Sequence, residues 1–407
     1  MATPEKILVR GVNWLGDAVM TTPALQRLRE AKPAAYITLL TPEKLAALWP
    51  GHPSVDTTIT FHDHDSVFSV AKRLRAERFD TAIVFPNSPR SALEVFLARI
   101  PRRIGYARGG RNFLLTQALP PRVGAVKMHK RSVAEIEQRI AANVPRETFP
   151  AEAHHVHDYL QLVATLGANP EPLPPLLHVG DDEVAAARTR FKLDGSGPLF
   201  ALNPGAEYGT AKRWPAERFV EAAANLHERT GCRWVVLGGR AEVELAQEIV
   251  TQLAARASTA SVTSVAGQTS LRELCAVLKA CALVITNDTG PMHVADALGT
   301  PVVVPFGSTS PELTGPLFAG FVVGQAPPPV SSVASAPACS PAGGGACFTK
   351  TGEGASPTSP PHALLRGEAA CAPCFLRECP VDFRCMKGIS ASQVVEAALA
   401  VWREPVR

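Results

Sequence analysis

The sequence predicts an α/β protein of two βαβ domains with mainly parallel sheets, and two observations support this prediction. Short runs of β-branched residues alternate with longer segments whose apolar residues recur every three or four positions, in one half of the chain and again in the other. The chain has 407 residues, more than one hydrophobic core usually supports, so we expect two domains of roughly 150 to 200 residues. Each domain is then a Rossmann-like sheet covered by helices.

The expected strands are short apolar runs. In the first half they are KILVR (6–10), YITLL (36–40), TTITF (57–61) and TAIVF (81–85), and in the second half PLFALNP (198–204), RWVVLGG (233–239), ALVITND (282–288) and PVVVPFG (301–307). The expected helices include PALQRLREAK (23–32), SVAKRLRAER (69–78), AERFVEAAANLHERTG (216–231) and SLRELCAVLKA (270–280). In parallel sheets ligands bind beyond the carboxyl ends of the strands, so functional residues are expected there.

The two domains are expected to join at a proline-rich segment, residues 167–183. Four prolines stand there, and proline neither continues a helix nor donates a hydrogen bond within a central strand. We therefore assign residues 1–178 to the first domain and residues 179–389 to the second. A final helix is expected within residues 390–407, where Ser390 provides an N-cap before an apolar stripe.

A second irregular segment, residues 325–370, is rich in Ala, Pro, Ser and Gly. Such a composition buries too little apolar surface to offset the entropy of ordering. It predicts a mobile insertion in the second domain.

The composition indicates a soluble protein that is not exported. No run approaches about 18 uninterrupted apolar residues, and the N-terminus MATPEKILVRG has no apolar core followed by a small-residue cleavage site. The nine cysteines are an odd number in a large chain, which argues against a disulfide framework and favours a reducing cytoplasm.

The charge is divided unevenly between the two parts of the chain. Residues 1–150 carry 22 Lys and Arg against 13 Asp and Glu, a net +9, whereas residues 151–407 carry 19 against 24, a net −5; together these give the +4 of the whole chain. The first part is expected to face an anionic partner, or else to carry a solvated basic surface. Its basic residues include Arg90, Arg99, Arg102, Arg103, Arg108, Arg111, Arg122, Lys127, Lys130 and Arg131.

A phosphate-binding turn is predicted in residues 284–307, VITNDTGPMHVADALGTPVVVPFG. An apolar strand ends near Asp288, Thr289 and Gly290 make a turn, and a helix follows. The start of that helix offers free N–H groups and a positive dipole end to a phosphate, Gly290 permits close approach, and His293 follows one turn later. The alternative is an ordinary turn in which Asp288 or Thr289 only caps the helix.

A second polar loop, NPGAEYGTAKRWP at residues 203–215, also follows a strand. Lys212 and Arg213 precede the next helix, where a cation can neutralise a departing phosphate, although a loop lysine is often only solvated. The chain has no Walker motif and no G-x-G-x-x-G after a strand; LGGRAEVE at residues 237–244 comes nearest but does not match. Phosphate binding without a kinase or dehydrogenase signature suggests a nucleotide-linked donor.

One carboxylate, Asp17, stands in the segment GVNWLGDAVMTTPALQRLR, which follows the first strand. It is either a helix cap, since Asp is among the best N-cap residues, or a free base. Thr22 and Pro23 form a second cap and first-turn pair, so the helix either bends there or begins afresh. If Asp17 is not needed as a cap, its carboxylate can act as a base.

Four cysteines near the C-terminus have a spacing that could hold zinc. Cys371, Cys374, Cys379 and Cys385 follow the pattern C-x2-C-x4-C-x5-C, which supplies four thiolates. The intervals are shorter than those of common zinc modules, so free or packed thiols are the alternative.

Taken together, these segments resemble the ADP-heptose:lipopolysaccharide heptosyltransferases of glycosyltransferase family 9, and within that family the heptosyltransferase II group. The matching segments follow the family order across nearly the whole chain. They are GVNWLGDAVMTTPALQRLR, FPNSPRSALEVFLARIPRRIGYARGGRNFLLT, HHVHDYL, NPGAEYGTAKRWP, NDTGPMHVADALGTPVVVPFGSTSPELTGP and CAPCFLRECPVDFRCM. The segment 325–370 departs from the family pattern.

The resemblance implies a GT-B fold, in which two Rossmann-like domains face each other across a cleft, and it implies roles for single residues. Asp17 would be the general base and Lys212 would contact the donor phosphates. The donor-binding residues would be Asp288, Thr289, Gly290, His293, Gly205 and Glu242, and the acceptor-binding residues Asn13, Asn87, Ser88, Arg108 and Arg111. The final helix would pack back on the first domain, and no metal or other cofactor would be needed.

The activity implied is inverting transfer of a heptosyl group from ADP-L-glycero-D-manno-heptose to the anionic heptosyl-Kdo2-lipid A inner core of lipopolysaccharide. The enzyme would be cytoplasmic, in peripheral contact with the membrane that carries its acceptor, and would bind no nucleic acid. Three alternatives stay open: a family member with a different acceptor or nucleotide-sugar, a nucleotide-sugar epimerase of the same architecture, and a non-catalytic nucleotide-binding module.

Overall fold

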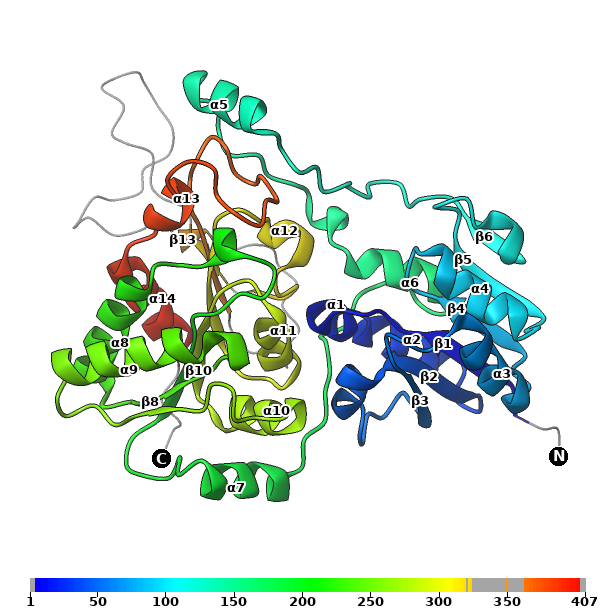
Figure 1. Cartoon of the computed structure of the whole chain (residues 1–407), viewed down its shortest axis with the longest axis horizontal. Helices are drawn as coiled ribbons and strands as arrows, with labels where there is room; N and C mark the ends of the chain where they lie inside the picture. Colours follow the sequence, from blue (N-terminus) through cyan, green and yellow to red (C-terminus); the bar gives the residue numbers. More distant parts are fainter. Residues whose placement is uncertain (1–3, 320, 324–347, 350–361, 403–407) are drawn as a thin grey trace.

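The computed structural model describes residues 4–319, 321–323, 348–349 and 362–402, and it shows two α/β domains side by side (Figure 1). Most of the segment predicted to be a mobile insertion, residues 325–370, lies outside these ranges. The end of that segment is not part of an insertion, because Ala363–Arg366 form a strand in the second sheet. The prediction of two mainly parallel sheets is confirmed.

The N-terminal sheet has six strands in the described residues, and all of them are parallel. The strands are β1 (Lys6–Arg10), β2 (Tyr36–Pro42), β3 (Thr57–Phe61), β4 (Thr81–Val84), β5 (Arg102–Tyr106) and β6 (Gln117–Leu119). They lie in the order β3-β2-β1-β4-β5-β6, so the winding reverses between β1 and β4. The loops that follow β1 and β4 therefore diverge at one edge of the sheet, which is where such sheets bind ligands.

The C-terminal sheet has eight strands in the described residues, and only the pair β12 and β13 is antiparallel. The strands are β7 (Leu199–Asn203), β8 (Arg233–Val236), β9 (Val262–Ser264), β10 (Leu283–Thr286), β11 (Val302–Phe306), β12 (Phe321–Val323), β13 (Phe348–Thr349) and β14 (Ala363–Arg366). Their order is β13-β12-β14-β11-β10-β7-β8-β9. The winding reverses between β7 and β10, so the loops after these two neighbouring strands meet.

Helices cover both faces of the sheets (Figure 1). The α-helices are α1 (Leu15–Met20), α2 (Thr22–Ala31), α3 (Val67–Glu77), α4 (Pro89–Leu97), α5 (Val133–Ala141), α6 (Val156–Ala164), α7 (Asp181–Arg190), α8 (Ala216–Thr230), α9 (Val243–Arg256), α10 (Leu271–Ala280), α11 (Gly290–Ala297), α12 (Pro311–Thr314), α13 (Arg384–Lys387) and α14 (Ala391–Val401). The short 3-10 helices are η1 (Glu43–Leu48), η2 (Asn112–Leu114), η3 (Ala151–Ala153), η4 (Thr210–Lys212) and η5 (Arg240–Glu242). None of the helices in the described ranges combines the length and apolar character that a membrane crossing requires.

The helix that contains Asp17 ends before Pro23, and a new helix begins. The first helix, α1, starts after Trp14 and ends at Met20, and α2 starts at Thr22 with Pro23 in its first turn. No side chain caps α1, and Asp17 lies inside its first turn rather than at the cap position. The cap interpretation of Asp17 is therefore wrong, and its carboxylate is not engaged in holding the helix start.

A part of the predicted first domain lies against the second domain. We call residues 126–153, which include α5, the crossing segment. Its arginines donate to backbone carbonyls of the C-terminal domain: Arg131 to Cys371 O at 2.7 Å, Arg139 to Ala370 O at 2.8 Å, and Arg146 to Gly307 O at 2.9 Å. In Figure 1 α5 lies beside α13, far from the N-terminal sheet. The chain thus passes between the domains more often than the single joint at 167–183 predicts.

The final helix packs on the C-terminal domain, so the prediction that it returns to the first domain is wrong. Helix α14 contacts α8, β11 and β14. Its apolar stripe, including Val394, Val395 and Val401, is buried in the core beneath the C-terminal sheet, and the ring of Trp402 lies 5.5 Å from that of Phe200. A stripe this apolar is most stable where it completes an existing core.

Candidate active site

Two helix starts, one from each domain, touch across the space between the sheets. A Cβ atom on Gly16 of α1 would lie 2.6 Å from Cδ2 of His293 in α11, and a Cβ atom on Gly290 would lie 2.6 Å from Cδ2 of Leu15. Carbon atoms do not approach this closely, so the contact requires glycine at both positions. Figure 1 shows α1 reaching from the N-terminal domain to α11. Asp17 is thereby brought to the predicted phosphate-binding turn.

Asp17 is partly buried at this contact, and its surroundings alter its acidity. Burial, the largest influence, raises the pKa of Asp17 to about 6. The nearby Lys212 ammonium lowers this pKa, and the Asp288 carboxylate raises it. These influences also show that the three charged groups, predicted from separate segments, share one site. Among the described residues, none donates a hydrogen bond to the Asp17 carboxylate, which remains available to a substrate hydroxyl.

Lys212 and Asp288 form an ion pair near Asp17, in which Asp288 is buried and Lys212 is partly buried. The Lys212 Nζ lies 2.7 Å from Asp288 Oδ2 and 3.2 Å from Asp288 O, and Thr309 Oγ1 donates to the same carboxylate at 2.7 Å. Burial alone would raise the pKa of Asp288, but Lys212 and the Thr309 hydroxyl hold it below its ordinary value. Asp288 therefore fixes the position of Lys212, and one of the three ammonium hydrogens is left for a ligand.

Two asparagines that were not predicted as site residues join the loops after β7 and β10. Asn203 Nδ2 donates to Thr289 Oγ1 at 3.0 Å, and Asn287 Nδ2 donates to Pro204 O at 2.7 Å. Asn287 Oδ1 accepts from the backbone N–H of Trp214 at 2.9 Å. Their position directly after the strands was the available signal, because neighbouring strand ends must be cross-linked by polar side chains if the loops are to keep one conformation.

The start of α11, where the sequence predicts phosphate binding, has no side-chain cap. Thr289 occupies the N-cap position but makes no side-chain hydrogen bond to its own helix, and its hydroxyl instead accepts from Asn203. The first amides of an eight-residue helix thus face the site without a cap. Burial lowers the pKa of His293, so its ring is neutral at pH 7 and packs on Gly16.

Gly205 and Glu242 lie together at the ends of β7 and β8. A Cβ atom on Gly205 would lie 1.9 Å from Glu242 Oε1, so any larger residue would displace this carboxylate. Glu242 Oε2 accepts from Gly239 N at 2.9 Å, and Arg213 Nη2 lies 3.7 Å from Oε1. The Glu242 carboxylate is therefore held at the ends of β7 and β8, in the same sheet whose β7 loop carries Lys212.

Arg111, predicted to bind the acceptor, is fully buried and occupied by backbone groups. Its guanidinium donates to Tyr106 O at 3.1 Å, to Ser88 O at 3.2 Å, to Asn87 Oδ1 at 3.3 Å and to Pro86 O. Burial lowers the pKa of Arg111 to about 10. The side chain fixes the loop after β4, and it is this loop, rather than Arg111, that is open to a ligand.

The other predicted acceptor residues, Asn13, Asn87, Ser88 and Arg108, are exposed. Asn13 is exposed, and its Oδ1 accepts from Arg10 Nη1 at 3.1 Å. Arg10 is itself buried against Glu94, with Nε and Oε2 2.9 Å apart.

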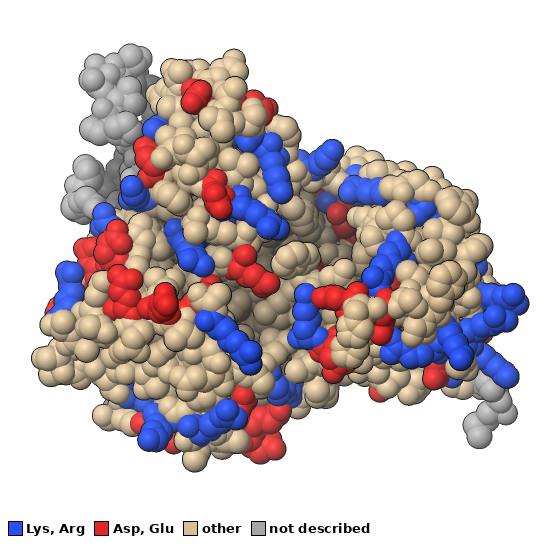
Figure 2. Space-filling model, viewed as in Figure 1, with Lys and Arg blue, Asp and Glu red and all other residues tan. Residues whose placement is uncertain are grey.

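Ser88 caps α4 by accepting from Ser91 N, so its hydroxyl is engaged locally. Arg108 is exposed beside the Tyr106 ring. Figure 2 shows Lys and Arg side chains of both domains along the rims of the hollow between them.

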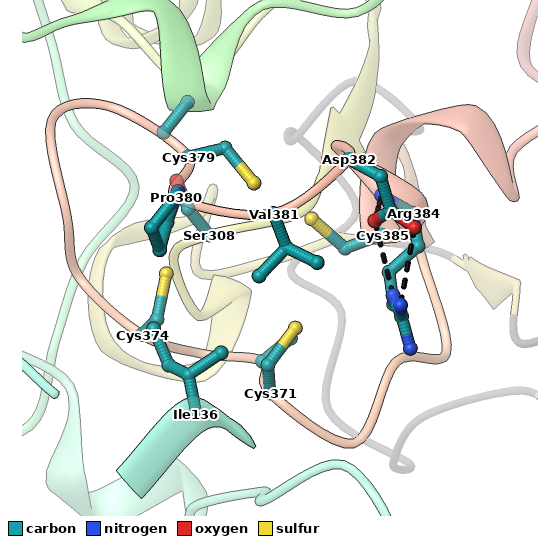
Figure 3. A pocket seen from close by; sticks show the side chains of 12 residues that line it. Ile136, Ser308, Cys371, Cys374, Cys379, Pro380, Val381, Asp382, Arg384 and Cys385 are labelled. Atoms are coloured by element: carbon teal, nitrogen blue, oxygen red, sulfur yellow. Dashed lines mark hydrogen bonds and ion pairs between the residues drawn. The ribbon is translucent and has the colours of Figure 1, made fainter. Parts of the chain in front are cut away.

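The four C-terminal cysteines lie within residues 371–385, a segment that ends in α13 and that we call the cysteine loop. Figure 3 shows Cys371, Cys374, Cys379 and Cys385 around a small cavity that the side chains of Pro380 and Val381 enter. Within the described part of the chain, no three His, Cys, Asp or Glu side chains are arranged to hold a metal ion. Burial raises the pKa of Cys385 to about 12, with Cys371 and Cys374 acting in the same direction. These cysteines are free thiols that pack in the loop.

Comparison with known proteins identifies the family. A family model described as glycosyltransferase family 9 (heptosyltransferase) matches residues 114–323. Lipopolysaccharide heptosyltransferase 2 of Salmonella typhimurium is 32% identical over 319 residues, which cover 77% of this chain and 85% of that protein.

Solved structures agree with the sequence comparison. The structure of Escherichia coli ADP-heptose lipopolysaccharide heptosyltransferase II has a TM-score of 0.69 at 26% identity and covers 98% of both chains. A family 9 glycosyltransferase from Veillonella parvula has a TM-score of 0.70 at 21% identity, covering 99% of this chain and 98% of its own, which supports the fold. The GT-B prediction is confirmed, and the chain belongs to glycosyltransferase family 9, the heptosyltransferases.

Proposed function

We propose that this protein transfers a heptosyl group, with inversion, from ADP-L-glycero-D-manno-heptose to the heptosyl-Kdo2-lipid A inner core of lipopolysaccharide. The main support for the proposal is that Asp17, whose carboxylate does not cap a helix, lies near the Lys212–Asp288 pair at the contact between α1 and α11. Relatives named lipopolysaccharide or lipooligosaccharide heptosyltransferase 2 support the choice of donor and acceptor.

Asp17 acts as the general base in a single displacement. The acceptor oxygen forms a bond to the anomeric carbon of the donor as the bond from that carbon to the ADP oxygen breaks. Asp17 takes the proton of the acceptor hydroxyl, and ADP leaves with the electron pair. With a pKa of about 6 the carboxylate is mostly ionised at neutral pH yet more basic than an exposed aspartate, which suits proton removal.

Lys212 and the first amides of α11 stabilise the departing ADP. Lys212 carries a full positive charge, and the first amides of α11 carry partial positive charges at the same site. One preorganised donor of this kind contributes about 3 kcal/mol to the transition state. ADP is a stable anion, so the reaction needs no acid partner like the second carboxylate of a glycosidase.

The remaining predicted residues are proposed to bind the donor from the C-terminal domain and the acceptor from the N-terminal domain. Gly205 and Glu242 bind the ribose. The Glu242 carboxylate and the Gly205 backbone beside it lie at the edge of the sheet, beyond the ends of β7 and β8. Asn13, Asn87 and Arg108 receive the acceptor, and Arg111 positions the Asn87 loop. Since the acceptor is attached to lipid, we also propose that the protein contacts the cytoplasmic membrane face from outside the bilayer.

The test is transfer with purified protein and defined substrates. ADP-heptose with heptosyl-Kdo2-lipid A is expected to release ADP and to give a product heavier by one heptosyl group. Donor alone tests for an epimerase, and Kdo2-lipid A in place of the heptosylated acceptor tests for a different acceptor in the same family. Absence of ADP release with every acceptor and heptose donor would refute the proposal.

A further inference from the structure

Three cations gather around the ring of Tyr208, beside the Lys212–Asp288 pair. Lys130 Nζ, Lys212 Nζ and Arg377 Cζ lie 6.0, 5.1 and 5.2 Å from the ring centroid. They come from the crossing segment, from the loop after β7 and from the cysteine loop. A single cation beside an aromatic ring is common, at roughly one per 70 to 80 residues, but like charges that converge on one ring repel each other.

Two of these cations have no acidic partner. Lys212 is balanced by Asp288, whereas neither Lys130 nor Arg377 makes an ion pair with any carboxylate among the described residues. Both side chains are exposed. The ring attracts cations only weakly, so the cluster carries an excess of positive charge that an anionic ligand would neutralise.

The cluster is built by close backbone contacts rather than by chance exposure. Tyr208 Oη donates to Phe375 O at 3.0 Å, and Ala211 N donates to Arg377 O at 2.9 Å. Between them, Gly209 has φ +154°, and a Cβ atom there would lie 2.2 Å from Arg377 O. No side chain fits at that position, so glycine allows the loop after β7 to lie directly on the cysteine loop.

The crossing segment is fixed to the same loop. Arg131, next to Lys130, donates from its backbone N–H to Cys374 O at 3.1 Å and from Nη1 to Cys371 O at 2.7 Å. Lys130 is therefore held by the C-terminal domain although it belongs to the first part of the sequence. All three cations and the ring are therefore attached to this domain, which also carries the start of α11.

We propose that Lys130, Arg377 and the Tyr208 ring form an anion subsite that holds the diphosphate of the donor together with Lys212. This inference rests on the proposed function and adds residues to its donor site. Because the subsite is part of the C-terminal domain, it serves the donor and not the lipid-linked acceptor, which the N-terminal domain receives. It also gives the cysteine loop a role, since that loop places Arg377.

The experiment measures binding of ADP and of adenosine to the full-length protein by calorimetry. Arg377→Gln and Lys130→Gln are each expected to weaken ADP binding about tenfold and to leave adenosine binding unchanged, because adenosine lacks the diphosphate. Arg377→Lys is expected to restore most of the ADP affinity. Tyr208→Phe, which keeps the ring, is expected to bind ADP better than Tyr208→Leu.

Arg190→Gln is the matched control, because Arg190 also lies 5.2 Å from an aromatic ring, that of Phe191, but on α7. It is expected to bind ADP like the parent. The Tm of every variant is compared with that of the parent, so that a folding defect is recognised.

The outcomes separate this inference from the proposed function. If the parent binds ADP but transfers no heptose, weaker ADP binding by the variants still supports the subsite. If the parent binds no ADP, inorganic pyrophosphate is the probe, and weaker pyrophosphate binding by the same variants supports an anion subsite without the nucleotide. If the variants bind ADP and pyrophosphate as tightly as the parent does, the inference is overturned. This holds also if the variants raise the KM of the acceptor, because the cations would then serve the acceptor and not the donor.

Discussion

At the scale of single residues, the site holds a carboxylate in surroundings that disfavour its charge. Asp17 is partly buried, lies near a second carboxylate, Asp288, and receives no hydrogen bond from the described residues. An aspartate that served only the fold would find a donor or an exposed position. Groups with such shifted acidity concentrate at functional sites, because the conflict that raises the pKa also makes the group a better base.

Replacing Asp17 by Asn tests this role directly. Asp17→Asn is expected to lower kcat by about 10³-fold, since a general base typically contributes 10² to 10⁴. ADP affinity is expected to stay within twofold of the parent, because Asp17 is proposed to contact the acceptor hydroxyl and not the nucleotide. The measurements are steady-state kinetics and calorimetry.

The same variant makes a second prediction about stability. The pKa of Asp17 is raised in the folded protein, so the charged form disfavours folding above about pH 6, and this cost is absent at a pH low enough to protonate the group in both states. Asp17→Asn is therefore expected to raise Tm at pH 8 but not at pH 3.5. A variant with full activity, or one whose Tm falls at pH 8, would contradict the assignment.

The pH dependence of the reaction is expected to follow Asp17 and to respond to Lys212. In the parent, kcat/KM should rise with pH through about 6, as the base loses its proton. The Lys212 cation lowers the pKa of Asp17, so Lys212→Met is expected to move this limb to higher pH besides reducing the rate about 10²-fold. An unchanged acid limb would show that another group is the base.

At the scale of elements, the activity depends on the contact between α1 and α11. Gly16→Ala adds a Cβ atom 2.6 Å from the buried His293 ring, which must then move away from α1. Because displacements of about 1 Å at a reacting centre cost up to 10²-fold, kcat is expected to fall at least tenfold. Kinetics give the rate, and small-angle scattering is expected to show a more open molecule.

ADP affinity is the control measurement for Gly16→Ala. Lys212, Asp288 and the start of α11 belong to the C-terminal domain, so ADP affinity should remain within twofold. A large loss of ADP binding would mean that the substitution disturbs more than the contact between the domains.

At the scale of the whole molecule, the division of charge sets the response to salt. Residues 1–125, which precede the crossing segment, carry 17 Lys and Arg against 10 Asp and Glu, a net +7, and include exposed basic residues such as Arg108. Ions screen interactions between exposed charges beyond about 8 Å at physiological ionic strength. The KM of the anionic acceptor is therefore expected to rise as the salt concentration increases from about 0.05 to about 0.3 M, because salt screens its attraction to the basic residues.

Salt is expected to raise the KM of the donor less than that of the acceptor, because Lys212 is partly buried and paired with Asp288, and only two exposed cations, Lys130 and Arg377, join it at the proposed diphosphate subsite. Initial rates with each substrate varied in turn measure both effects. If salt raises the KM of the donor more than that of the acceptor, the anionic acceptor does not meet the basic domain as proposed.

Sequence patterns predict the sheets and the local geometry of the donor loops, but they fail for two packing decisions. Helix α14 is recognisable from Ser390 and its apolar stripe, yet the stripe fits the core under α8 and not the first domain. The crossing segment is equally invisible, because Arg131 and Arg146 bond to backbone carbonyls, which every residue has and which leave no pattern in the sequence.

The sequence by itself determined the two parallel sheets, the strand-end loops and the residue types of the site, because these follow from hydrophobic periodicity, turn chemistry and the position of polar groups after strands. Only the tertiary structure decided that Asp17 meets Lys212 and Asp288, that Arg111 supports a loop instead of facing a ligand, and that Lys130 belongs with the donor domain. Those outcomes depend on which surfaces pack together, and the packing of distant segments is a property of the whole chain that no local pattern encodes.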